Sequence, residues 1–175
     1  MSDNFTIESA DVKDGDLRPF GPVDPETKRQ LSIPEKFTRV VKYSEIPLAV
    51  ELTCVFDGEK IQVSKLCAMS QPEAYVTSRD LTQLSLPAVI RQIGLQVIPD
   101  AEYWTMEWQD SQSVKLGLKS DPHFLAQLYW FEHATWGSPR VAVQEYMGCK
   151  RTTANYYIRL AAGVTALPGL HKKAK

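Results

Sequence analysis

Five side chains near the carboxyl terminus have the chemistry to contact DNA. An Arg can form a fork of hydrogen bonds with guanine O6 and N7, and an Asn can do the same with adenine N6 and N7. Arg151, Thr152 and Asn155 supply these groups and a hydroxyl within one short segment. Tyr156 and Arg159 follow, and both side chains can reach phosphate oxygens. The pattern indicates recognition of double-stranded DNA.

The charge of the chain is distributed unevenly. The 175 residues carry a net charge of −1, but the part from Gly137 onward is formally +6 and residues 1–136 are −7. No acidic residue follows Glu145, whereas a solvated helix face normally includes Asp or Glu. A basic end joined to an acidic remainder is typical of a nucleic-acid contact confined to one end. The alternative is a solubilising lysine tail, and without residues 171–175 the charge of this end falls to +3.

Three helices must position these side chains. Asp121-Pro122 is an N-cap and first-turn pair, and apolar spacing predicts a first helix that runs to Ala134. Gly137-Ser138-Pro139 ends this direction and begins a second helix of about ten residues. Its apolar positions are Val141, Ala142, Val143 and Met147.

A tight turn separates the second helix from the third. Gly148 lies where such a turn needs a positive φ, and Cys149 follows as a small buried residue. The third helix is predicted over 151–162, with one apolar side formed by Ala154, Tyr157, Ile158 and Ala161. A helix, a short Gly turn and a second helix form a helix-turn-helix. A helical hairpin that only packs on its neighbours is the alternative.

The segment VQEYMGCKRTTANYYIRLA, which starts at Val143, resembles the helix-turn-helix of small regulators from actinobacteria and their phages. In that family an apolar-Gly-apolar turn precedes Ser-Arg-Ser/Thr-Thr-Ala and an aromatic-Ile-Arg ending. The resemblance covers Ser138–Ala162 and, more weakly, Val76–Ile98. Two residues depart from the pattern: Gln144 replaces a usual small Ala, and Cys149 is the apolar turn residue.

The resemblance implies which residues meet DNA. Lys150, Arg151, Thr152, Asn155 and Tyr156 would face the DNA, with Arg159 on its backbone. Arg140, at the start of the second helix, completes the candidate set.

A β region precedes the helices. Every second residue of Leu48–Phe56 is apolar, which predicts a half-buried strand. Asp57-Gly58 then predicts a two-residue type I′ hairpin loop. This loop would pair Phe56 with Glu59, Cys54 with Ile61, and Leu52 with Val63.

Further elements would complete a small antiparallel sheet. Extended stretches at Thr38–Tyr43 and Glu73–Thr77 are candidate edge strands. Ser85 and Pro87 begin a predicted helix whose Val89, Ile90, Ile93 and Val97 would cover the hairpin.

These elements predict an α+β fold with five segments. Residues 1–35, with eight acids and four prolines, are expected to be a disordered or extended acidic arm. Residues 36–100 form the β-hairpin and helix module, 101–121 a linker, 122–170 the helix-turn-helix module and 171–175 a basic tail. Tyr103, Trp104 and Trp108 in the linker are expected to pack between the modules. An alternative is that the acidic arm folds over the basic end and competes with DNA.

Other protein classes find little support. The composition, 43% hydrophobic and 23% charged, is typical of a soluble globular chain, and neither a spanning helix nor a signal peptide is expected. A cytoplasmic location and reduced cysteines follow from this expectation. The sequence has no phosphate loop, nucleophile elbow or His-Glu-x-x-His motif, and His123 and His133 are too far apart to share a metal. An enzyme is therefore not expected, nor is a cofactor or a metal.

The prediction is thus a transcriptional regulator, of phage or actinobacterial origin, that binds specific double-stranded DNA as a homodimer. One recognition helix reads few base pairs, so paired half-sites are expected. The alternative is a phage or mobile-element protein that binds a host protein and uses the helix-turn-helix as a scaffold. A DNA reader should expose Arg151, Thr152 and Asn155, whereas a scaffold could bury them against the first 100 residues.

Overall fold

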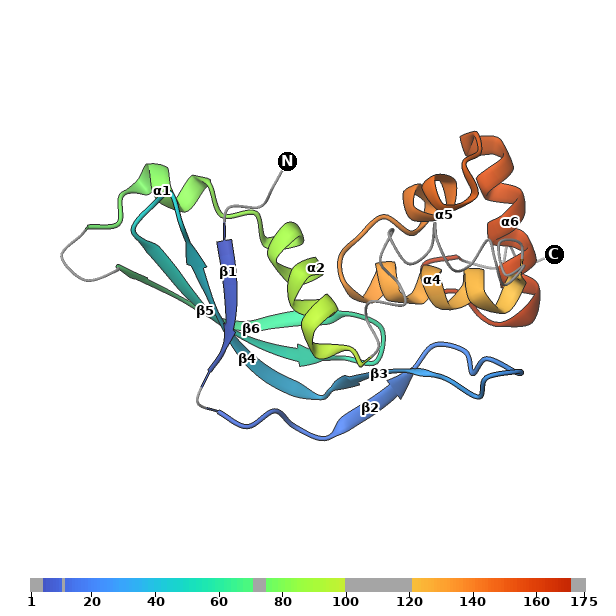
Figure 1. Cartoon of the computed structure of the whole chain (residues 1–175), viewed down its shortest axis with the longest axis horizontal. Helices are drawn as coiled ribbons and strands as arrows, with labels where there is room; N and C mark the ends of the chain where they lie inside the picture. The colour runs from blue at the N-terminus through green and yellow to red at the C-terminus, as the bar shows by residue number, and fades with distance from the viewer. Residues whose placement is uncertain (1–4, 11, 71–74, 100–120, 171–175) are drawn as a thin grey trace.

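The computed structural model describes residues 5–10, 12–70, 75–99 and 121–170 (Figure 1). It confirms a mixed α+β fold with a four-stranded antiparallel sheet, and the described residues also form a two-stranded ribbon and five helices. The sheet lies beside α4, α5 and α6, and α2 lies between the sheet and these helices (Figure 1). The predicted linker at 101–121 and the basic tail at 171–175 lie outside the described residues, apart from Asp121.

The four-stranded sheet has the order β1-β4-β5-β6. Its strands are β1 (Phe5–Ser9), β4 (Lys36–Tyr43), β5 (Leu48–Phe56) and β6 (Ile61–Ser70). Alternation along β5 places every second side chain in the core, as its spacing predicts. These buried residues are Leu48, Val50, Leu52, Cys54 and Phe56.

The hairpin between β5 and β6 differs from the prediction by two residues. The observed pairs are Phe56 with Ile61, Cys54 with Val63, and Leu52 with Leu66. The pair of Leu52 and Leu66 is shifted by one further residue, because the register is irregular between Thr53 and Cys54. The predicted pairs with Glu59, Ile61 and Val63 are therefore wrong.

The cause is the Asp57 side chain, which holds a longer loop. Its Oδ1 accepts hydrogen bonds from the backbone N–H groups of Glu59 and Lys60, both at 2.8 Å. Asp57 N also donates to Lys60 O at 3.1 Å, so four residues form the loop. Next to the loop, a shift by two residues keeps the side chains on their predicted faces, because side chains alternate with period two. Beyond the irregularity between Thr53 and Cys54 the shift is three residues, so the later side chains of β6 lie on the face opposite to the predicted one.

The amino-terminal segment is built into the fold, so the expectation of a disordered arm over 1–35 is wrong for its described residues. It contains β1, which pairs with β4, and a ribbon of β2 (Leu17–Phe20) and β3 (Leu31–Pro34). Phe20, Leu31 and Ile33 are buried in the core.

An ion pair also holds this segment on the sheet. The buried Arg39 guanidinium donates to both oxygens of Asp14, at 2.7 and 2.6 Å. A two-pronged pair of this kind fixes geometry as well as charge. Asp14, one of the acids that favour a solvated arm in the sequence, is therefore the ion-pair partner of Arg39.

Two helices follow β6. Thr77 and Asp80 form a capping box at the start of α1 (Ser78–Thr82), and residues 75–77 are not in a strand. The predicted edge strand at Glu73–Thr77 is therefore not observed in its described part, and Glu73 lies outside the described residues. The predicted covering helix is α2 (Leu86–Val97), which buries Val89, Ile90, Ile93 and Val97.

The last three helices are α4 (Pro122–Ala134), α5 (Pro139–Met147) and α6 (Arg151–Val164). Asp121 Oδ1 accepts the backbone N–H of His123 at 3.0 Å, so Asp121 caps α4 as its sequence predicts. Helix α4 buries eight of its thirteen residues, among them the polar Gln127 and Glu132. It is the central element of the helical part of the chain.

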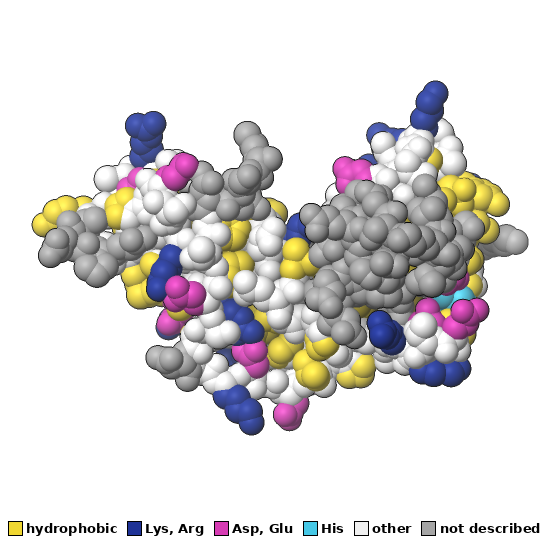
Figure 2. All heavy atoms as spheres, viewed as in Figure 1, with side chains coloured by type: hydrophobic (Ala, Val, Ile, Leu, Met, Phe, Trp, Pro, Cys, Tyr) yellow, Lys and Arg dark blue, Asp and Glu magenta, His cyan; other side chains and the backbone are white. Residues whose placement is uncertain are grey.

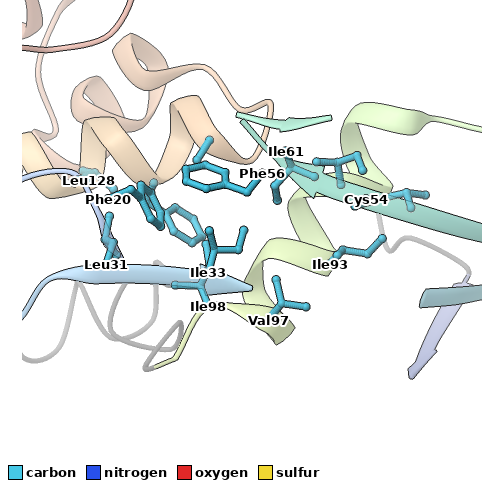
Figure 3. Packing of buried hydrophobic residues seen from close by; sticks show 14 of the residues in the cluster. Phe20, Leu31, Ile33, Cys54, Phe56, Ile61, Ile93, Val97, Ile98 and Leu128 are labelled. Atoms are coloured by element: carbon cyan, nitrogen blue, oxygen red, sulfur yellow. The ribbon is translucent and has the colours of Figure 1, made fainter. Parts of the chain in front are cut away.

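Helix α4 also joins this helical part to the sheet. Gln127 Nε2 donates to Pro22 O at 3.1 Å and to Arg29 O at 3.0 Å, in the loop between β2 and β3. Figure 3 shows Leu128 of α4 beside Phe20, within the same cluster as Phe56 and the α2 residues. One hydrophobic core therefore runs from the sheet into the helices.

Helix α2 meets the end of α4 at Gly94. A Cβ on Gly94 would collide with the Thr135 side chain, whose Oγ1 donates to Phe131 O at 2.9 Å. We expect Gly94→Ala to lower the free energy of unfolding by about 1–3 kcal/mol, although alanine favours helix. Denaturant unfolding followed by circular dichroism measures this change. Gln96→Ala, at an exposed position of α2, is the matched control, and equal stability of both variants would contradict the predicted close contact.

Candidate nucleic-acid interface

The turn between α5 and α6 depends on the conformation of Gly148. This residue adopts the left-handed region, with φ +58°, and its N–H donates to Glu145 O at 3.0 Å. The N–H of Cys149 closes the turn by donating to Gln144 O at 3.1 Å. A Cβ on Gly148 would touch nothing within 4 Å, so the requirement for glycine is conformational. The predicted function of Gly148 in the turn is thus observed.

One side of α6 packs against the other helices. Ala154, Ile158 and Ala161 are buried, and Tyr157 is half-buried, as the helical spacing predicts. Small and branched side chains at these positions let α6 lie close to α4. The opposite side of α6 is left to solvent.

All seven candidate DNA-binding residues are exposed. They are Arg140, Lys150, Arg151, Thr152, Asn155, Tyr156 and Arg159. We call the six from Lys150 onward the outer face of α6. Figure 2 shows Lys and Arg side chains that project from the surface over α5 and α6. None of the seven is buried against the sheet, which is where a co-opted scaffold could have placed them.

The start of α6 favours negatively charged groups. Lys150 is the N-cap residue, its side chain forms no capping hydrogen bond, and the first turn contains no acid. The first N–H groups of the helix therefore lack a side-chain acceptor, and the helix dipole adds a partial positive charge beside Lys150 and Arg151. Phosphate oxygens are the natural acceptors for such N–H groups.

The two departures from the family pattern are accommodated. Gln144 is half-buried, and the inward side chains of α5 are Val143 and Tyr146. Tyr146 packs on Phe124 of α4 with ring centroids 5.1 Å apart. Cys149, expected to be buried, is only half-buried.

Sequence reasoning missed the contacts that hold α5 in place. Trp136 adopts φ +61°, and its indole N–H donates to Ile61 O on β6 at 2.5 Å. Gly137 N donates to Glu132 O at 2.8 Å, and the Glu132 carboxylate pairs with Arg91 Nη1 of α2 at 2.5 Å. In the sequence, the signal for these contacts is Glu132, an acid on the apolar side of the predicted first helix.

The Glu132 carboxylate is 2% exposed, whereas the Arg91 side chain is 39% exposed. Burial raises the pKa of Glu132, and the neighbouring Arg91 acts in the opposite direction. The ion pair therefore keeps a buried charge compensated at the connection from α4 to α5.

Their places in the predicted first helix make His123 an exposed first-turn residue and His133 a last-turn residue that the helix dipole would stabilise when charged. His123 is half-buried at the start of α4. Burial lowers the pKa of His133, and Lys60 adds to this effect. The lowered pKa favours neutral imidazole, so the expected interaction of a charged His133 with the helix dipole is not supported.

The described residues bear on two other kinds of site. They contain no group of three or more His, Cys, Asp or Glu residues that could hold a metal ion. Among the helices formed by these residues, none has the length and apolar character needed to cross a membrane.

No protein-family model, curated protein or solved structure matches the chain.

Proposed function

We propose that this chain is a sequence-specific double-stranded DNA-binding protein and a transcriptional regulator, of actinobacterial or phage origin, with α5 and α6 as a helix-turn-helix. The observation that carries the proposal is the outer face of α6. It presents Arg151, Thr152 and Asn155 to solvent, and no acidic residue occurs anywhere in α6. These side chains can recognise base edges directly, because they have the required donors, acceptors and methyl group.

The placement of these residues along α6 supports insertion into the major groove. Arg151, Thr152 and Asn155 lie in its first turns, and recognition helices contact bases with their amino-terminal residues. Arg159 lies two turns from Arg151 on the same side, where it would meet the phosphate backbone. The buried side of α6 keeps the helix on the protein while this outer side enters the groove.

The test is selection of binding sites from a pool of randomised duplexes by the full chain, at two salt concentrations. We expect an enriched motif and an affinity that falls steeply with salt, since neutralised phosphates release counterions. Absence of enrichment at both salt concentrations would refute the proposal. That outcome would favour the alternative, a phage or mobile-element protein that binds a host protein through this scaffold.

Arg140 provides a second test that separates backbone contact from base recognition. It is exposed in the first turn of α5, and the first helix of a helix-turn-helix crosses the DNA backbone. We expect Arg140→Ala to weaken binding to selected and unrelated duplexes by the same factor. It should also reduce the magnitude of the slope of log K against log salt by about 0.9. Fluorescence anisotropy at several salt concentrations measures both effects. A loss confined to the selected duplex would place Arg140 on a base instead.

A further inference from the structure

The carboxyl-terminal half of α6 carries an apolar stripe that begins at Tyr156 of the outer face. Tyr156, Leu160 and Val164 follow one another at intervals of four residues and are 58%, 37% and 40% exposed. Residues four apart share one side of a helix, so these side chains form a continuous apolar stripe. Figure 2 shows hydrophobic side chains gathered on the surface over α6. From Leu160 to Val164 there is no charged residue.

Gly163 adds a second, independent observation on the same half of the helix. Glycine inside a helix is unfavourable relative to alanine, and Gly163 has no positive φ that would require it. A Cβ at this position would meet nothing within 4 Å, so no contact within the described structure excludes a side chain. A residue without a side chain next to exposed Leu160 and Val164 suits the close approach of another helix.

The position of Gly163 along α6 indicates what that helix is. Gly163 lies twelve positions after Arg151, which corresponds to about 18 Å at the helical rise. Two antiparallel copies of α6 that cross at Gly163 would hold their Arg151 residues about 36 Å apart, and half-sites one DNA turn apart lie about 34–36 Å from each other. A second copy of this chain therefore fits both the chemistry of the stripe and the spacing of the DNA grooves.

We propose that two copies of this chain pair through the carboxyl-terminal halves of their α6 helices, with Leu160 and Val164 packed about a two-fold axis at Gly163. This inference rests on the proposed DNA-binding function, because the DNA repeat selects this arrangement over other partners. It divides α6 along its length: the first turns recognise DNA, and the last turns bind the second copy. Tyr156 lies between the two halves.

Sedimentation of the full chain over a range of protein concentrations tests the pairing without DNA. We expect the unmodified chain to self-associate, and Leu160→Glu and Gly163→Gln each to weaken association at least tenfold. Leu81→Glu, at another exposed leucine, on α1, is the matched control and should leave association unchanged. Circular dichroism melting checks folding; Gly163→Gln should retain the fold, because its side chain enters open space.

The outcomes separate this inference from the proposed function. A chain that stays monomeric, or a dimer that Leu160→Glu leaves intact, would overturn the pairing through α6 even if DNA binding is found. With a selected motif in hand, Leu160→Glu should bind a single half-site like the unmodified chain and lose cooperative binding to two half-sites one turn apart. If no motif is selected but Leu160→Glu abolishes the dimer, the proposed function fails and the interface between copies stands.

Discussion

Replacement of Arg151 or Asn155 by alanine will weaken binding to the selected duplex by about 1–3 kcal/mol each, or about 5- to 150-fold in Kd. Both side chains are exposed in the first turns of α6, so neither replacement removes a buried contact. The loss comes from a forked pair of hydrogen bonds that water replaces only in part. Fluorescence anisotropy with the selected duplex measures the change.

Controls separate base recognition from loss of positive charge. Arg79→Ala removes an exposed arginine from α1, outside the candidate interface, and should change the affinity little. Arg151→Lys keeps the charge but lacks the fork, so it should restore binding to unrelated duplexes without restoring preference for the selected one. If Arg151→Ala, Asn155→Ala and Arg79→Ala all have equally small effects on the affinity for the selected duplex, α6 is not the recognition helix.

Arg91→Ala will lower the free energy of unfolding at neutral pH by about 2–3 kcal/mol. The substitution leaves the Glu132 carboxylate, which is 2% exposed, without its partner inside the protein. A fully buried pair would cost about 3–5 kcal/mol, but Arg91 is partly exposed, so water can enter its place. Denaturant unfolding of both chains at matched pH measures the difference.

The deficit caused by Arg91→Ala will depend on pH in a defined direction. Burial raises the pKa of Glu132 in the folded state, and loss of Arg91 removes an opposing influence, so the pKa rises further. The folded variant then binds a proton more tightly than the unfolded chain does, and its stability rises as pH falls. The deficit should therefore be largest near neutral pH and should shrink as the pH falls toward the ordinary glutamate pKa of 4.5.

The double variant Arg91→Ala with Glu132→Gln provides the control for this pH effect. Glutamine has no charge to compensate, so the part of the deficit that varies with pH should disappear. A deficit in Arg91→Ala that stays constant between neutral pH and the ordinary pKa would show that the charge of Glu132 is not its cause.

The helical end of the chain was predictable because its signals are local. Helix α6, its buried side and the left-handed Gly148 each depend on residues within a few positions of one another. Asp121 as a cap and the covering helix α2 belong to the same class. Exposure of the outer face of α6 follows once the buried side is assigned.

The rest of the structure depends on contacts that the sequence does not mark. Phe20 belongs to a segment rich in acids and prolines, and its apolar character matters only because it meets Phe56 and Trp130, far along the chain. The pair of Arg91 and Glu132 joins residues 41 positions apart, and no periodicity reveals it. The observed hairpin register differs from the predicted one because the Asp57 carboxylate accepts hydrogen bonds from two backbone N–H groups. These hydrogen bonds stabilise the four-residue loop in competition with the two-residue turn.

Helix α4 has buried contacts with both the sheet side and α5. Gln127 of α4 faces the loop between β2 and β3, and Phe124 of α4 packs on Tyr146 of α5; both side chains are buried. Separation of the chain immediately before or after α4 would therefore expose core residues to water. The segment α5–α6 is therefore not a portable cassette that could be transplanted between proteins, since both recombination points disrupt the same core. Substitutions on the exposed outer face of α6 leave this shared core intact, whereas exchange of the whole segment does not.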